Sequence, residues 1–230
     1  MGVVGLGGIE AQAASERRVS GRLIAWLVFV GSLAILNWAG RASGPPPKNA
    51  AYHWDFAVGS VVQFVFLLGI IALIARGEWS LLALRRPRGW SGAIGTAFLV
   101  LVLVSIVNLA LDPVLHPGRE QGLTPDKWEP NRAPQFALFV FAVVILAPFT
   151  EELAFRGLGY GLLRPYGLVP PIVGSSFLWA LAHGLPDALP VITLLGIGLA
   201  WIRHRQGSTI PGMFLHATFN GLALAVALAA

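Results

Sequence analysis

Seven stretches of this chain are apolar over lengths that suit membrane helices. They cover residues 23–39, 56–75, 94–111, 136–164, 171–183, 188–202 and 210–229. A helix needs roughly 20 apolar residues to cross the hydrocarbon core of a bilayer. None of the seven stretches alternates between apolar and polar residues as the strands of a membrane barrel do. The pattern therefore predicts an all-α protein, a polytopic transmembrane helical bundle of seven or eight membrane helices.

These helices are expected to form one domain. Residues 1–20 are small and polar and predict a disordered cytoplasmic tail, whereas residues 21–230 predict a single transmembrane bundle domain. The stretch 136–164 contains Pro148, which predicts a kink because proline cannot donate a backbone hydrogen bond. The segment 111–134 is rich in proline, glycine and charge, and we expect a long loop over one mouth of the bundle. The sequence leaves its role as a lid open.

Composition places the chain in a lipid bilayer. It is 56% hydrophobic and 12% charged, whereas soluble proteins have roughly 25% charged residues. Cysteine is absent, so the protein has neither a disulfide framework nor a thiolate nucleophile. The net charge of +5 resides at the ends of the apolar stretches, and without a basic stripe of interleaved aromatic residues we expect no nucleic-acid partner. Nothing in the composition sets the oligomeric state.

The basic residues also predict the orientation of the bundle. If the N-terminus is inside, the inner segments contain ten arginines, namely Arg17, Arg18, Arg22, Arg76, Arg85, Arg86, Arg88, Arg164, Arg203 and Arg205. The outer segments then contain five basic residues, namely Arg41, Lys48, Arg119, Lys127 and Arg132. Since lysine and arginine are enriched in inner loops, we predict a multi-pass protein of the bacterial cytoplasmic membrane with its N-terminus inside.

Two groups of residues in the apolar stretches are interpreted as structural. Five tryptophans near helix ends are expected to anchor the bundle at the membrane interface: Trp26, Trp38, Trp54, Trp79 and Trp90. Three isolated amides are expected to form hydrogen bonds between helices: Asn37, Gln63 and Asn108.

Three ionisable residues in different stretches are predicted to meet at one depth of the membrane. Burying such a group in hydrocarbon costs at least about 2–3 kcal/mol, so it is retained mainly where it lines a polar cavity. Counted from the expected helix ends at about 1.5 Å per residue, Glu151 and His183 lie ~20 Å deep and His216 ~12 Å deep. The alternative is structural, because a lone histidine is often an interhelical hydrogen bond and a glutamate pair is often solvated. Their convergence favours a site.

Helical spacing assigns expected roles within this group. Glu152 and Arg156 are four residues apart with the acid first, the favourable order for a helical ion pair. Glu151 points about 100° away around the helix and has no local cation, and a poorly solvated carboxylate is a usable general base for activating water. His216 and Asn220 share one helix face and offer donors for an oxyanion. His183, with Trp179 one turn before it, could hold the same water or take the leaving-group proton.

Three motifs carry a resemblance to a known family. The segments EELAFR (151–156), WALAH (179–183) and HATFN (216–220) resemble the CPBP family of intramembrane proteases, also called Abi, which includes CAAX prenyl endopeptidases and bacteriocin-immunity proteins. The family core would span residues 134–229. The one departure is Trp179, where the family usually has phenylalanine.

The resemblance implies an intramembrane endopeptidase that hydrolyses a peptide bond of a membrane-associated or lipidated protein or peptide. Glu151 and His183 would activate the water, and His216 and Asn220 would stabilise the oxyanion. The supporting residues would be Glu152, Arg156 and Trp179.

Cofactor use and two rival functions remain open. We expect no cofactor, with zinc held by Glu151, His183 and His216 as the alternative, because the chain has no His-Glu-x-x-His helix. The first rival is a non-proteolytic membrane scaffold or bacteriocin-immunity protein with the same fold. The second is a transporter with a proton-relay pair, which predicts repeated halves that the sequence lacks.

Overall fold

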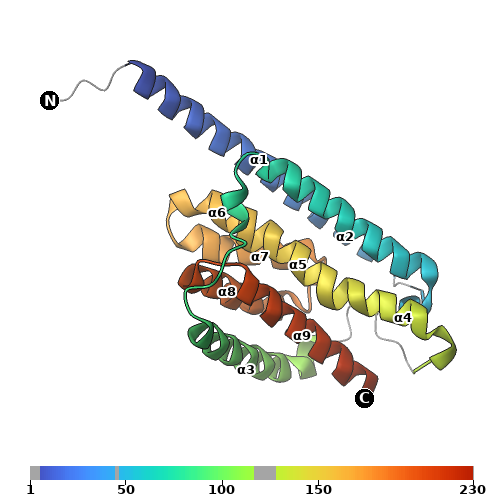
Figure 1. Cartoon of the computed structure of the whole chain (residues 1–230). Helices are drawn as coiled ribbons and strands as arrows, with labels where there is room; N and C mark the ends of the chain where they lie inside the picture. The colour runs from blue at the N-terminus through green and yellow to red at the C-terminus, as the bar shows by residue number, and fades with distance from the viewer. Residues whose placement is uncertain (1–5, 45–46, 117–127, 230) are drawn as a thin grey trace.

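The fold is known from a computed structural model, which describes residues 6–44, 47–116 and 128–229. Every regular element in these residues is helical (Figure 1). The helices outside the composite helix described next are α1 (Leu6–Ala42), α2 (Trp54–Ala75), α3 (Trp90–Leu115), α7 (Ser175–Ala182), α8 (Leu189–Gln206) and α9 (Ile210–Ala229). The predicted all-α bundle is confirmed.

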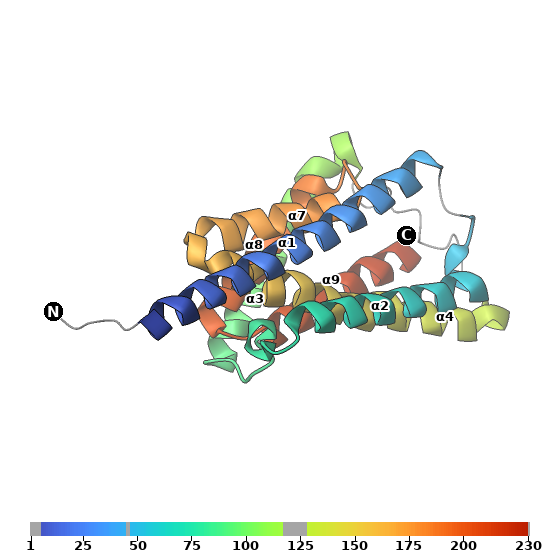
Figure 2. The same cartoon turned by 90° about the horizontal axis from the view of Figure 1, so that it is seen from above.

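A composite helix, called the site helix below, runs through the bundle. Its parts in order are α4 (Ala133–Val140), the π-helical η4 (Phe141–Leu146), α5 (Ala147–Glu152), the π-helical η5 (Leu153–Gly159) and α6 (Tyr160–Leu163). The remaining short elements are η1 (Ala50–Tyr52), η2 (Trp79–Leu82), η3 (Pro130–Arg132), η6 (Arg164–Tyr166) and the π-helical turn η7 (Pro170–Gly174) before α7. The site helix contacts α2 and α9, α7 packs on α1 and α8, and α3 lies outermost against α8 and α9 (Figures 1 and 2).

Within the described residues, four helical segments are long and apolar enough to cross a membrane. They are Gly21–Ala42, Trp54–Ala75, Trp90–Leu115 and Pro130–Tyr166. In the last of these 44% of the most apolar window is buried inside the protein, against 11% in Trp90–Leu115. Large side chains on α3 face outward, such as Phe98 at 69% and Leu109 at 76% exposed. Such an apolar exterior suits lipid rather than water, so the protein is an integral membrane protein with the site helix inside.

The N-terminal segment differs from the prediction. Helix α1 begins at Leu6, so the disordered tail expected over residues 1–20 is wrong for residues 6–20. The physical reason is composition, because this segment is rich in alanine, glutamate, glutamine and arginine, which favour helices even when they are polar. Residues 1–5 lie outside the described part of the chain.

The expected loop 111–134 is shorter than predicted. Helix α3 continues to Leu115 with Pro113 inside its last turn, where the proline removes one backbone hydrogen bond to the preceding turn. Residues 117–127 lie outside the described part of the chain, so the lid stays a prediction.

Trp26 does not lie at the membrane interface as expected. Its side chain is fully buried, and the indole Nε1 donates to the carbonyl of Ala154 in η5 at 2.8 Å. The ring fits against Gly159, where an added Cβ would lie 2.3 Å from the indole. Trp26 is therefore a packing contact between α1 and the site helix.

Helix α1 also holds the end of α7. Asn37 Nδ2 donates to the Ala182 carbonyl at 2.7 Å, and Trp38 Nε1 donates to the Leu181 carbonyl at 2.8 Å. The interhelical role predicted for Asn37 is confirmed, whereas the described residues include no such bond for Gln63 or Asn108. The Ala182 carbonyl is one that a helix end leaves without a backbone donor, whereas the Leu181 carbonyl also accepts the Gly184 N–H at 3.2 Å. The two bonds from α1 fix the chain just before His183.

Candidate active site

The site helix changes to π-helical geometry just before the glutamate pair. The Ala147 N–H donates to the Ala142 carbonyl, five residues back, and Pro148 has no N–H to give. The Val143 carbonyl therefore has no helical donor. The N–H four residues ahead, that of Ala147, already donates to Ala142, and the residue five ahead is Pro148. Asn220 of α9 supplies the missing donor, since its Nδ2 donates to the Val143 oxygen at 2.9 Å.

This contact places Asn220 differently from the sequence analysis. No contact in the described part of the chain links Asn220 to the two imidazoles or to Glu151; its amide instead ties α9 to η4. Its role as an oxyanion donor stays a prediction. The sequence offered a signal for the observed contact, because Pro148 requires an unpaired carbonyl three to five residues upstream.

Asn220→Ala separates the two roles. If the amide chiefly satisfies Val143, the variant will lose about 1–3 kcal/mol of unfolding free energy, the cost of a buried carbonyl without a partner. Its kcat will fall by less than about tenfold, because an oxyanion donor is worth roughly 10²–10³. Thermal unfolding in micelles and peptide cleavage measure the two quantities. A fall of 10² or more in kcat at unchanged stability would restore the oxyanion role.

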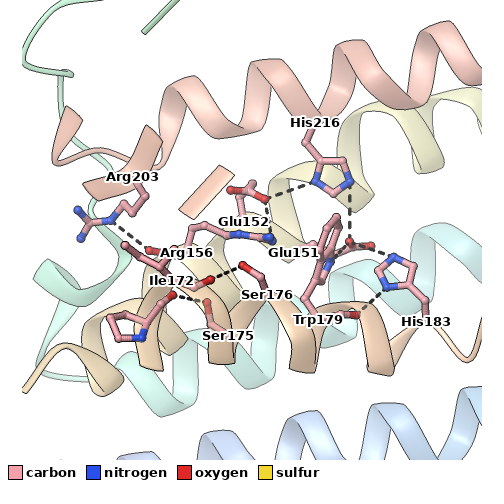
Figure 3. A network of polar contacts seen from close by, with 11 residues as sticks. Glu151, Glu152, Arg156, Ile172, Ser175, Ser176, Trp179, His183, Arg203 and His216 are labelled. Atoms are coloured by element: carbon pink, nitrogen blue, oxygen red, sulfur yellow. Dashed lines mark hydrogen bonds and ion pairs between the residues drawn. The ribbon is translucent and has the colours of Figure 1, made fainter. Parts of the chain in front are cut away.

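Glu151 lies between two imidazoles that come from different helices (Figure 3). Its Oε2 is 3.7 Å from Nε2 of His183, which follows α7, and 4.0 Å from Nε2 of His216 on α9. The side chains of Glu151 and His183 are 21% and 20% exposed, whereas His216 is 3% exposed. The three predicted residues therefore meet at one place, where Glu151 and His183 are partly exposed and His216 is buried.

The tautomer of His183 follows from its hydrogen bond. Nδ1 lies 2.8 Å from the Trp179 carbonyl, which can only accept, so Nδ1 carries the proton. In the neutral ring Nε2 is then an acceptor facing the Glu151 carboxylate, another acceptor. A molecule with two donors, such as water, fits between such a pair.

Trp179 contacts four other side chains of the site. Its indole Nε1 donates to Glu151 Oε2 at 2.6 Å, and its rings pack edge-on against His183 and His216 at centroid distances of 5.0 and 5.1 Å. The Arg156 guanidinium lies over the same indole, 4.3 Å from the centroid. The sequence predicted only an aromatic wall at Trp179 and gave no sign of the hydrogen bond to Glu151.

We expect Trp179→Phe to lower kcat about tenfold, because a hydrogen bond to a charged group that fixes the carboxylate is lost. KM will change by less than about twofold, since Glu151 itself remains. The control is Trp79→Phe, the same change at an exposed position, which will leave both constants unaltered. A parental kcat in Trp179→Phe would show that the bond does not position Glu151.

Glu152 and Arg156 form the predicted ion pair. Arg156 Nη1 donates to Glu152 Oε1 at 3.1 Å, and both side chains are fully buried. His216 Nδ1 lies 3.5 Å from the same oxygen, within ion-pair distance but outside hydrogen-bonding geometry. Both ring nitrogens of His216 therefore face a carboxylate.

Two glycines let α8 and α9 approach this pair. A Cβ at Gly212 would lie 2.7 Å from Glu152 Oε2, and a Cβ at Gly196 would lie 2.9 Å from Arg156 Nη2 and 3.1 Å from the Trp179 ring. Only a residue without a side chain fits at either position. The sequence analysis did not identify these glycines, because nothing local distinguishes them from other glycines of the apolar stretches.

The described side chains do not fit a zinc site. No group of three or more histidine, cysteine, aspartate or glutamate residues in the described part of the chain stands where it could hold a metal ion. Glu151 Oε2, the oxygen nearest both imidazoles, already accepts the Trp179 indole N–H. Cofactor use nevertheless stays a prediction for experiment.

The fold and the site define an integral membrane protein that holds a carboxylate and two imidazoles inside a helical bundle. Residues 133–222 match the model of the family described as type II CAAX prenyl endopeptidase, Rce1-like. The match spans 90 of the 230 residues and covers all three motifs, so it confirms the resemblance to the CPBP family over this part of the chain. Neither a curated protein nor a solved structure matches the chain.

Proposed function

We propose that the protein is an intramembrane endopeptidase that hydrolyses a peptide bond of a membrane-associated or lipidated protein or peptide. The observation that carries the proposal is the pair of facing acceptors, Glu151 Oε2 and His183 Nε2, 3.7 Å apart. One water can donate a hydrogen to each of them, which leaves an oxygen lone pair directed away from both groups. This is the arrangement that general-base activation of water requires.

The same geometry accounts for each proton. As the water oxygen bonds to the scissile carbonyl carbon, Glu151 takes its proton and the carbonyl electrons form an oxyanion. A carboxylate oxygen lies within ion-pair distance of each ring nitrogen of His216, and we assign its Nε2–H as the oxyanion donor. When the oxyanion re-forms the C=O bond and the C–N bond breaks, the proton passes from Glu151, with His183 adjacent, to the leaving amine. The second water proton stays on the new carboxyl group.

Glu152, Arg156 and Trp179 position these groups. The buried ion pair holds the helix turn that carries Glu151, and the Arg156 guanidinium supports the indole that donates to it. The substrate class rests on the family match and on the membrane location, which together favour a CAAX-like or other lipidated chain end. We place the active site in the bacterial cytoplasmic membrane with the N-terminus inside, as the arginine distribution favours.

The proposal is tested by trapping the substrate. The Glu151→Gln variant, expressed as the full chain in native membranes and cross-linked, is expected to retain proteins or peptides that the parent releases as cleaved products. Glu78→Gln, the same change at an exposed position, is the control and will trap nothing. If the parent and both variants capture the same uncut proteins, the protein is a non-proteolytic scaffold.

Metal dependence has its own measurement. Because the described geometry needs no ion to place water between Glu151 and His183, we expect activity to survive exhaustive dialysis against a zinc chelator within about twofold. Stoichiometric zinc that tracks activity across preparations and is lost in His216→Ala would establish the zinc alternative.

A further inference from the structure

Arginines from two segments meet at the end of the bundle where α8 turns into α9. Arg85 Nε donates to the Gly207 carbonyl at 2.7 Å, and Arg88 Nη1 donates to the Arg205 carbonyl at 3.2 Å. A Cβ built at Gly207 would lie 3.7 Å from Arg85 Nη2 and 3.8 Å from Arg88 Nε, so both guanidinium groups flank this turn. We call Arg85, Arg88 and Arg205 the arginine rim.

The arginine rim has positive charge without a local counter-charge. All three side chains are exposed, and within the described residues no carboxylate forms an ion pair with any of them. Each of the two guanidinium groups that bonds a carbonyl uses one nitrogen for it and keeps further N–H donors. The rim therefore offers several donors to an anion, and phosphate is the anion whose oxygens match guanidinium geometry.

An apolar groove runs along the outside of the bundle, and one of its lining residues, Trp90, follows Arg88 of the arginine rim by two residues. It lies between α3 and α9, has a volume of about 490 Å³, and is lined by Trp90, Ile94, Ala97, Phe98, Pro211 and Phe214 among others. Trp90 opens α3, and its ring packs edge-on against Phe214 at 6.2 Å. We call this the α3–α9 groove.

The chemistry of the groove selects an apolar chain. Only Trp90 and Thr218 of its lining carry a polar side-chain atom, and the Thr218 hydroxyl already donates to the Phe214 carbonyl at 2.8 Å. A peptide strand would leave its backbone groups without partners there, whereas a hydrocarbon chain would not. Trp90 is also the side chain that prefers the depth at which headgroups meet hydrocarbon.

We propose that the arginine rim and the α3–α9 groove form one binding site for an anionic glycerophospholipid, with the phosphate on the rim and an acyl chain in the groove. The site is separate from the carboxylate–imidazole site and does not depend on the proposed function. Two independent features carry the inference: unpaired cationic donors at the surface, and an apolar groove whose lining includes Trp90, two residues after Arg88. A basic surface without the groove would attract anionic lipids without holding a particular molecule.

The test is lipid titration of the full chain purified in neutral detergent micelles, followed by thermal unfolding. Dioleoylphosphatidylglycerol and dioleoylphosphatidylcholine share the same chains, so their comparison isolates the headgroup charge. We expect the phosphatidylglycerol to bind about tenfold more tightly. Inorganic phosphate alone should bind far more weakly, because it gains nothing from the groove.

Two variants separate the rim from the groove. Arg88→Gln should weaken phosphatidylglycerol binding roughly fivefold. It should weaken phosphatidylcholine binding less, because the choline cation already neutralises the phosphate of that lipid. Arg76→Gln, the same change at an exposed position on the α2 side, should alter neither. Ala97→Phe fills the groove and should weaken both lipids about tenfold. Its control is Ala110→Phe, on the exposed surface of the same helix, which should weaken neither.

Three results would overturn the proposal. The first is equal affinity for the two lipids in the parent protein, and the second is identical behaviour of Arg88→Gln and Arg76→Gln. The third is stabilisation by inorganic phosphate as strong as by the lipid, which would indicate a free phosphate site. Arg88 is exposed, so its variant needs no repacking and remains informative even if Ala97→Phe does not fold.

Discussion

Glu151→Gln will lower kcat/KM by about 10³-fold or more while the protein stays folded. A general base contributes roughly 10²–10⁴ to a rate, and the amide cannot take the proton of the attacking water. The shape of the side chain is kept, and its oxygen can still accept from the Trp179 indole, which now donates to Glu151 Oε2 at 2.6 Å. Cleavage of a quenched fluorescent peptide with a farnesylated CAAX end, in proteoliposomes, measures the effect.

The control for this experiment is Glu78→Gln, since Glu78 is exposed and, within the described residues, its side chain accepts only from the nearby Ser80 hydroxyl. It should keep kcat/KM within about twofold, and both variants should unfold within ~1 kcal/mol of the parent. A Glu151→Gln protein that keeps a tenth of the parental rate would exclude Glu151 as the base. If the parent cleaves neither this peptide nor any trapped protein, the endopeptidase proposal itself fails.

Arg156→Met will cost about 3–5 kcal/mol of unfolding free energy. The change leaves the fully buried Glu152 carboxylate without its cation, and an unpaired charge inside a protein carries a desolvation penalty of that size. The guanidinium contact with the Trp179 ring, 4.3 Å from the centroid, is lost as well. Unfolding in micelles, followed by tryptophan fluorescence or by heat, gives the free energy.

A second pair in the same chain provides the control. Glu129 and Arg132 are three residues apart with a 3.4 Å contact, but their side chains are 22% and 47% exposed, so Arg132→Met should cost less than about 1 kcal/mol. The double variant Glu152→Gln, Arg156→Met should recover much of the lost stability, because neither residue is then charged. Equal losses in Arg156→Met and Arg132→Met would contradict a structural role for the buried pair.

Helical periodicity and the estimated depth of each residue in the membrane predicted part of the site. The spacing of Glu152 and Arg156 predicted an ion pair that is present, and counting residues from helix ends brought Glu151, His183 and His216 to one level, where they are found together. These relations depend on the constant rise and turn of a helix. The catalytic roles of these residues stay predictions.

Tertiary contacts decided the hydrogen-bond partners of side chains, which helical periodicity cannot predict. The direction of a side chain depends on how its helix is rotated against its neighbours. This rotation directs the Trp179 indole to Glu151 and the Asn220 amide to the Val143 carbonyl. It also directs Trp26 to the core and not to lipid. The π-helical turns of the site helix also depend on tertiary contacts. They leave backbone carbonyls without a helical donor, and side chains of other helices donate hydrogen bonds to these carbonyls.

The sequence by itself determined that this chain is an all-α membrane bundle and which ionisable residues share a depth, because apolar length and helical spacing are local properties. Only the tertiary structure decided which hydrogen-bond donor meets which acceptor. A hydrogen bond requires its atoms to be placed within a few tenths of an ångström, and that placement is set by packing between segments far apart in the chain, such as α1 against the end of α7.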